Sequence, residues 1–149
     1  MVTVHLPPDF KEFFRWFEEH AVEYLLVGGY AVGYHGYPRA TMDLDVWIAA
    51  TAENAGRVIA ALTDFGFGGD MLKESMFVIP DQIIRMGLPP MRIEILTSID
   101  GVEFAEAYRQ RIDDELDGVP VRLISLHHLK QNKRAAGRPK DLADLAELP

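Results

Sequence analysis

The sequence predicts a single domain of the α/β (α+β) class, in which helices pack against a mixed β-sheet. Two observations predict this class. Short runs of β-forming residues alternate along the chain with amphipathic helical patterns. The stretch 24–48 reads as a strand, a Gly-Gly turn, a short helix and a second strand in direct succession. We expect a core over about 1–124 and a short helical segment over about 125–149.

The composition narrows the class of protein. A chain of 149 residues has room for one domain with a hydrophobic core, and 48% hydrophobic residues is normal for a globular protein. No apolar run approaches the length of a membrane span, so no membrane partner is expected. The absence of cysteine excludes disulfides and thiolate metal sites. These features predict a cytoplasmic protein.

The charge is acidic overall but uneven along the chain. A formal net charge of −8 argues against a general nucleic-acid coat protein. The stretch 122–140 nevertheless contains only basic charges and no acidic residue. This stretch is either a surface that attracts an anionic substrate or the solvated face of a helix, and charge alone favours neither interpretation.

The first elements are a helix and a strand. A helix is predicted over 10–20, with Phe13, Phe14 and Phe17 on or near its buried face. The β-forming run 24–27 then ends abruptly at a glycine pair. The aromatic residues of the helix are more typical of a core than of a platform that stacks on bases.

Gly28 and Gly29 lie between this strand and a short helix predicted over 30–36. Two glycines permit positive φ angles and leave the backbone N–H groups open to a ligand. The N-terminus of the following helix would favour an anion such as phosphate. The alternative is an ordinary tight turn.

The next strand, predicted over 42–49, carries two carboxylates. Residues two apart in a strand share a face, so Asp43 and Asp45 project together while Leu44 and Val46 face the opposite, apolar side. Neighbouring carboxylates repel each other unless a cation lies between them, and carboxylate oxygens are natural ligands of Mg²⁺. The alternative is a strand with one solvated face, but the glycine pair and the acidic strand together favour a phosphate site that faces a metal site.

The middle of the chain predicts a helix over about 52–65 and strands over 71–79 and 82–86. A further strand over 91–97 places Glu94 on the face opposite to Ile93 and Ile95. If this strand lies beside 42–49, Glu94 joins the two aspartates in a three-carboxylate cluster.

The last third predicts a helix over 101–111, a solvated acidic stretch over 113–117 and a strand over 119–124. Ser125 caps a helix over about 126–136, Gly137 ends it, and Pro139 suits the first turn of a last helix over 140–148. By itself this last segment is a helix–helix corner.

The glycine pair and the run Arg39-Ala40-Thr41-Met42-Asp43-Leu44-Asp45 together match a known signature. It resembles that of the DNA polymerase β-like nucleotidyltransferase superfamily. More closely, it resembles the small bacterial nucleotidyltransferases that include the AbiEii-type and mycobacterial toxins of toxin–antitoxin systems. The resemblance extends to 133–145 and so covers most of the chain. It implies transfer of a nucleoside monophosphate from an NTP, such as ATP, to a hydroxyl group, with Mg²⁺ or Mn²⁺.

The resemblance also implies roles for particular residues. Three carboxylates would bind metal and take part in catalysis: Asp43, Asp45 and Glu94. The nucleotide would be bound by Gly28, Gly29, Arg39, Thr41, Lys133, Arg138, Lys140 and Asp141. Two positions depart from the family pattern, because the third acid is usually an aspartate and many members have a serine where Gly29 stands.

The acceptor stays open at this point. Candidates are the 3′ end of tRNA, a protein hydroxyl or a small molecule such as an aminoglycoside, and a toxin would have a cognate antitoxin as partner. The alternative function is a non-catalytic module that binds a nucleotide or a partner protein with a degenerate active site.

Overall fold

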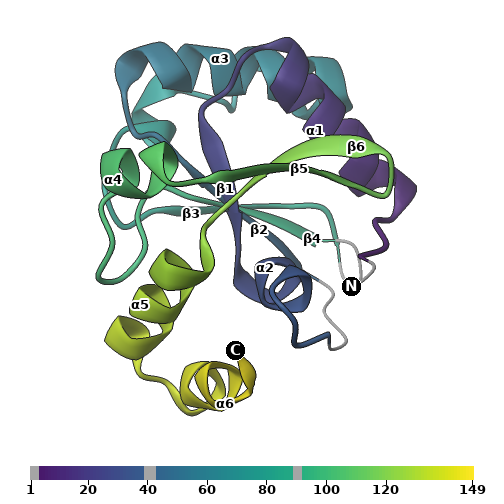
Figure 1. Cartoon of the computed structure of the whole chain (residues 1–149). Helices are drawn as coiled ribbons and strands as arrows, with labels where there is room; N and C mark the ends of the chain where they lie inside the picture. The colour runs from purple at the N-terminus through teal and green to yellow at the C-terminus, as the bar shows by residue number, and fades with distance from the viewer. Residues whose placement is uncertain (1–3, 39–42, 89–91) are drawn as a thin grey trace.

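The computed structural model describes residues 4–38, 43–88 and 92–149 (Figure 1). Two predicted nucleotide-binding residues, Arg39 and Thr41, lie outside this part of the chain.

The described residues form one mixed sheet that helices cover on both faces. The strands are β1 (Tyr24–Val27), β2 (Asp43–Ile48), β3 (Ile83–Met86), β4 (Arg92–Leu96), β5 (Ile112–Leu116) and β6 (Val119–Leu123). The α-helices are α1 (Pro8–Glu19), α2 (Gly28–Tyr34), α3 (Ala52–Leu62), α4 (Phe104–Arg109), α5 (Leu126–Ala136) and α6 (Pro139–Glu147). Two short helical turns, η1 (Thr63–Phe67) and η2 (Glu74–Phe77), follow α3. The predicted α/β class is therefore confirmed.

The sheet has the order β3-β4-β2-β1-β6-β5. β2 and β4 run parallel, as do β1 and β6, and the other neighbouring strands are antiparallel. The central strand β1 is buried along its whole length, as its continuous run of apolar residues requires. Tyr24 and Leu26 contribute to one core cluster, and Leu25 and Val27 to the other.

Each face of the sheet has its own core. On one face, α1 and α3 supply residues such as Phe13, Phe17 and Val58. On the other, α2 and the C-terminal helices supply residues such as Val32 and Leu129. Figure 1 shows α1 and α3 above the sheet and α2, α5 and α6 below it. Within the described residues, no helix combines the length and the apolar character that crossing a bilayer requires.

Two stretches differ from their predicted structure. The strand predicted over 71–79 is wrong, because η2 turns this segment so that Phe77 packs fully buried in the core beneath α3. The acidic stretch 113–117 is largely a strand, β5, at the edge of the sheet. An edge strand needs only one partner, and its exposed acidic side chains discourage pairing with another chain.

The C-terminal helices match their predicted positions closely. The Ser125 hydroxyl accepts a hydrogen bond from the His128 backbone N–H at 3.2 Å, which caps α5. Gly137 ends the helix in the left-handed region with φ 65°, and Pro139 begins α6. This corner leads α6 back toward the face of the sheet that α2 covers (Figure 1).

Candidate active site

The site begins where β1 passes into α2. Val27, the last residue of β1, pairs with Asp45 of the antiparallel strand β2, so the glycine that follows lies directly against Asp45. Gly28 has φ +69°, and a Cβ placed there would lie 2.1 Å from Asp45 Oδ2. Only glycine therefore fits this position beside the carboxylate.

Strand β4 brings the third carboxylate beside the first two. In the parallel pair β2–β4, Asp45 lies opposite Glu94 and Asp43 lies opposite Arg92. The predicted adjacency of these two strands is confirmed. The alternation along both strands sends these four side chains to one face, while Leu44, Val46, Ile93 and Ile95 enter the core on the other.

Two arginines, which the sequence reasoning missed, contact the acidic cluster. Arg92 Nη2 donates a hydrogen bond to Asp43 Oδ2 at 3.0 Å, and its Nε lies 3.6 Å from Glu94 Oε1. On the neighbouring strand β3, Arg85 Nε donates to Glu94 Oε1 at 3.1 Å. The available signal was the alternation Arg92-Ile93-Glu94, which predicts that Arg92 and Glu94 share a face.

Asp45 has a strongly perturbed acidity. Its half-buried position removes water from the carboxylate, and the negative charges of Glu94 and Asp43 lie close by. Together these effects raise the pKa of Asp45 from its ordinary 3.8 to about 7, against a smaller opposite effect of Lys140. The site thus concentrates more negative charge at Asp45 than its surroundings neutralise.

This pKa shift predicts how the stability of the metal-free protein depends on pH. The pKa of Asp45 is higher in the folded protein than in the unfolded chain, so the protonated Asp45 carboxyl contributes stability to the fold. This contribution is fully present below about pH 4 and is lost as the pH rises through about 7. The side chain introduced in Asp45→Asn cannot titrate. We therefore expect the free energy of unfolding of this variant, relative to that of the wild type, to increase as the pH is raised from 5 to 8. Urea unfolding in EDTA measures this difference, and parallel pH profiles for the two proteins would contradict it.

The donor set at this site fits a divalent cation. Asp43 and Asp45 project from one strand and provide hard oxygen donors that line the cavity, and the missing Cβ of Gly28 makes room for the Asp45 carboxylate itself. The described residues contain no group of three His, Asp or Glu side chains arranged to hold an ion. The side chain of Glu94 lies instead between the two arginines, so its role as a third metal ligand stays a prediction.

A cavity of about 670 Å³ opens over these carboxylates. Most of the predicted site residues line this cavity. They are Gly28, Gly29, Asp43, Asp45, Glu94, Lys133, Arg138 and Lys140. Both Arg138 and Lys140, at the start of α6, are exposed toward solvent. The basic residues of α5 and α6 therefore form a basic wall of the same cavity that the acidic side chains of β2 and β4 line.

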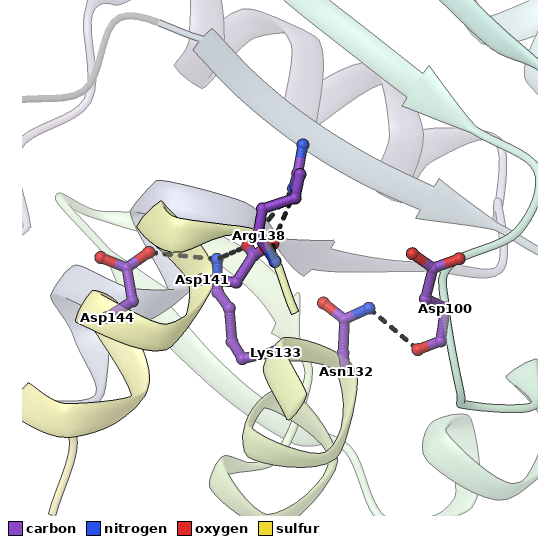
Figure 2. A network of polar contacts seen from close by, with 6 residues as sticks. All are labelled: Asp100, Asn132, Lys133, Arg138, Asp141 and Asp144. Atoms are coloured by element: carbon purple, nitrogen blue, oxygen red, sulfur yellow. Dashed lines mark hydrogen bonds and ion pairs between the residues drawn. The ribbon is translucent and has the colours of Figure 1, made fainter. Parts of the chain in front are cut away.

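Asp141 lies behind this wall and holds it in place (Figure 2). Its buried carboxylate accepts hydrogen bonds from Arg138 Nε at 2.7 Å and Nη2 at 3.3 Å, and from the Arg138 backbone N–H. Burial alone would raise the pKa of Asp141, but the contacts with Arg138 and Lys133 lower it overall. The paired hydrogen bonds orient the Arg138 guanidinium, whose side chain is 62% exposed.

Lys133 is buried between two carboxylates of α6. Its Nζ lies 3.3 Å from Asp141 Oδ1 and 3.1 Å from Asp144 Oδ2, and its side chain is only 7% exposed. Figure 2 shows the lysine extending from α5 toward both acids. Lys133 therefore joins the two helices as well as lining the cavity.

Because of this burial, we expect Lys133→Met to lower the free energy of unfolding by about 3–5 kcal/mol, since two buried carboxylates each lose one positively charged partner. Urea unfolding at pH 7.5 measures the loss. Lys130→Met is the matched control on the same helix, at a half-buried position, and should cost less than about 1 kcal/mol. Equal losses in the two variants would contradict the buried network.

The cavity also has polar lining residues that were not predicted. They include Asp81, Ser98, Asp100 and Asn132. Ser98 Oγ donates to Asp81 Oδ1 at 2.8 Å, and Asn132 Nδ2 donates to the Asp100 backbone carbonyl at 3.0 Å (Figure 2). These residues come from loops and from α5, so no single stretch of sequence indicated them.

Sequence comparison finds no family model and no curated protein that matches this chain. Solved structures do match. A candidate nucleotidyltransferase of Thermotoga maritima, TM1012, is 15% identical and has a TM-score of 0.60, with 92% of this chain and 88% of that chain covered.

The antibiotic-resistance factor ANT(2″)-Ia also matches, in two structures. Its solution structure is 14% identical with a TM-score of 0.57, and the match covers 93% of this chain and 79% of ANT(2″)-Ia. Its crystal structure in complex with adenylyl-2″-tobramycin is 14% identical with a TM-score of 0.54, and the match covers 92% and 83%. By its likeness to these proteins, the chain has a nucleotidyltransferase fold.

Proposed function

We propose that this protein transfers a nucleoside monophosphate from an NTP to a hydroxyl group, with a divalent cation. The observation that carries the proposal is the meeting of Gly28, Asp43, Asp45 and Glu94 in one cavity with the basic residues at the start of α6. An NTP–cation complex needs both kinds of group within a single site.

In this proposal, Asp43 and Asp45 hold the cation, and the backbone of Gly28 and Gly29 lines the place of the phosphates. When bound, the cation supplies positive charge to the phosphates and acidifies the attacking hydroxyl. Arg138 and Lys140, which line the same cavity, offset the charge of the departing pyrophosphate. Lys133 and Asp141 keep the basic wall in position through their buried contacts.

The reaction is a displacement at the α-phosphorus. The acceptor oxygen forms a bond to this phosphorus, and the bond from the phosphorus to the bridging oxygen breaks, which releases pyrophosphate. Glu94, beside Asp45 in the sheet, is the candidate to receive the hydroxyl proton. The acceptor would approach along the polar lining that contains Asp81, Ser98, Asp100 and Asn132.

The test uses ATP, CTP, GTP and UTP labelled at the α-phosphate, each with Mg²⁺ or Mn²⁺. The acceptors are total tRNA, a protein lysate and an aminoglycoside, one for each class of hydroxyl. Label should enter one acceptor class from α-labelled nucleotide, whereas γ-labelled nucleotide should leave the acceptor unlabelled because pyrophosphate departs. Transfer of the γ-label would contradict the proposal.

A second function has one observation in its favour. Arg85 and Arg92 both contact the Glu94 carboxylate. This pairing suits a module that binds a nucleotide without transferring it. Nucleotide binding without any label transfer, in a folded protein, would favour this alternative. A toxin role with a cognate antitoxin and a cytoplasmic location are proposals that rest on the sequence alone.

A further inference from the structure

The acidic cluster contains a continuous row of alternating charges across three strands. Arg85 of β3, Glu94 and Arg92 of β4, and Asp43 of β2 contact one another in this order. The register places Arg85 opposite Glu94, and Arg92 opposite Asp43, so the row follows from strand pairing. We call these four residues the charge row.

Arg92 is the member of the charge row that contacts a proposed cation ligand. Its Nη2 donates to Asp43 Oδ2, and its side chain is 33% exposed where it lines the cavity. Its Nε is buried and makes no hydrogen bond with the described residues. The guanidinium thus contacts two carboxylates. It carries five N–H donors, and those in its exposed part can serve another anion that enters the cavity.

We propose that Arg92 makes cation binding depend on the nucleotide. In the free protein, its guanidinium neutralises Asp43 and repels a bare divalent cation. When an NTP enters with its cation, the triphosphate attracts the guanidinium, which then pairs with phosphate oxygen and leaves Asp43 to the cation. The inference rests on the proposed function, because it takes Asp43 and Asp45 as the cation ligands.

Electrostatic repulsion determines the direction of the effect. The Arg92 guanidinium hydrogen-bonds to Asp43. Its positive charge is therefore separated from any ion that Asp43 binds by a single carboxylate group. Repulsion over such a distance, at the dielectric of a partly exposed site, is expected to weaken binding of a bare divalent cation by about tenfold. A triphosphate reverses the balance, since an arginine fork pairs well with phosphate oxygens.

The first experiment measures Mn²⁺ binding without nucleotide, from the free-ion signal in electron paramagnetic resonance. Arg92→Gln should tighten Mn²⁺ binding by about tenfold. Arg92→Lys retains the charge and should bind Mn²⁺ within about twofold of the wild type. Arg85→Gln is the matched control, because Arg85 contacts Glu94 from β3 and is 56% exposed, and its effect should be clearly smaller.

The second experiment repeats the titration with a non-hydrolysable NTP analogue. The analogue should tighten Mn²⁺ binding more in the wild type than in Arg92→Gln, and by reciprocity Mn²⁺ should tighten analogue binding by the same factor. Thermal melting of each variant verifies that it is folded. Should Arg92→Gln unfold, Arg92→Met tests the same loss of charge with a side chain of similar length.

The outcomes separate this inference from the proposed function. Tighter Mn²⁺ binding in Arg92→Gln, with reduced coupling to the analogue, supports the inference. Unchanged or weaker binding in that variant overturns it, and so does an equal effect of Arg85→Gln, which would indicate a general charge effect. Label transfer by the wild-type protein, measured on the same preparation, tests the proposed function independently.

Discussion

Replacing Asp43 and Asp45 together by asparagine is expected to abolish nucleotide transfer while the protein stays folded. The amide groups keep the shape of the side chains but remove the negative charges that would hold the cation. We expect transfer to fall by about a thousandfold or more, equivalent to a loss of about 4 kcal/mol in transition-state stabilisation. The measurement is label transfer from α-labelled NTP under saturating Mg²⁺.

Folding of this double variant has to be verified separately. Removing the Asp45 charge relieves repulsion at a half-buried site, whereas removing the Asp43 charge weakens a partly exposed ion pair with Arg92. The two effects oppose each other, so the melting temperature at pH 8 should stay close to that of the wild type. Asp70→Asn, at an exposed position in the loop after η1, is the matched control and should transfer label normally. Normal transfer by the double variant would show that Asp43 and Asp45 are not needed for catalysis.

Gly28→Ala is expected to damage both stability and activity. A residue with a Cβ is strained at φ +69°, which costs about 1–2 kcal/mol. The new Cβ would also lie 2.1 Å from Asp45 Oδ2, so the carboxylate has to move away from its position. A displacement of about 1 Å in a reacting group can lower the rate by about a hundredfold, and we expect a loss of that order.

The control for this substitution lies in the same helix. A Cβ on Gly33 would have no heavy atom within 4 Å, so Gly33→Ala should be neutral or stabilise the helix by up to about 1 kcal/mol. Chemical denaturation and label transfer measured on both variants separate a local effect at Asp45 from a general effect of alanine in α2. Gly28→Ala with wild-type stability and transfer would show that Asp45 is not held against this glycine.

Several features could be predicted because they depend on neighbours in the sequence. Gly137 and the Ser125 cap define the bounds of α5, and α5 has the predicted range Leu126–Ala136. The alternation Asp43-Leu44-Asp45 likewise determines that both carboxylates share a face. These patterns express local geometry, which the amino-acid order specifies directly.

Other features depend on contacts between distant parts of the chain. The row of Arg85, Glu94, Arg92 and Asp43 forms only because β4 lies between β3 and β2. The segment predicted as a strand over 71–79 adopts a helical turn because Phe77 finds its place in the core beneath α3. A run of β-forming residues becomes a strand only where a neighbouring strand is available to pair with it.

By itself, the sequence determined the α/β class, the acidic face of β2 and the helical corner at the C-terminus, since each follows from periodicity or backbone freedom over a few residues. The glycine pair was predicted as a turn before a helix over 30–36, whereas in the structure it forms the start of α2, Gly28–Tyr34. The tertiary structure alone decided which strands are neighbours, that Lys133 is buried between Asp141 and Asp144, and that Arg92 contacts Asp43. These salt bridges join residues 8 to 49 positions apart in the chain. Their energies depend on separation and burial in space, which only the folded chain establishes.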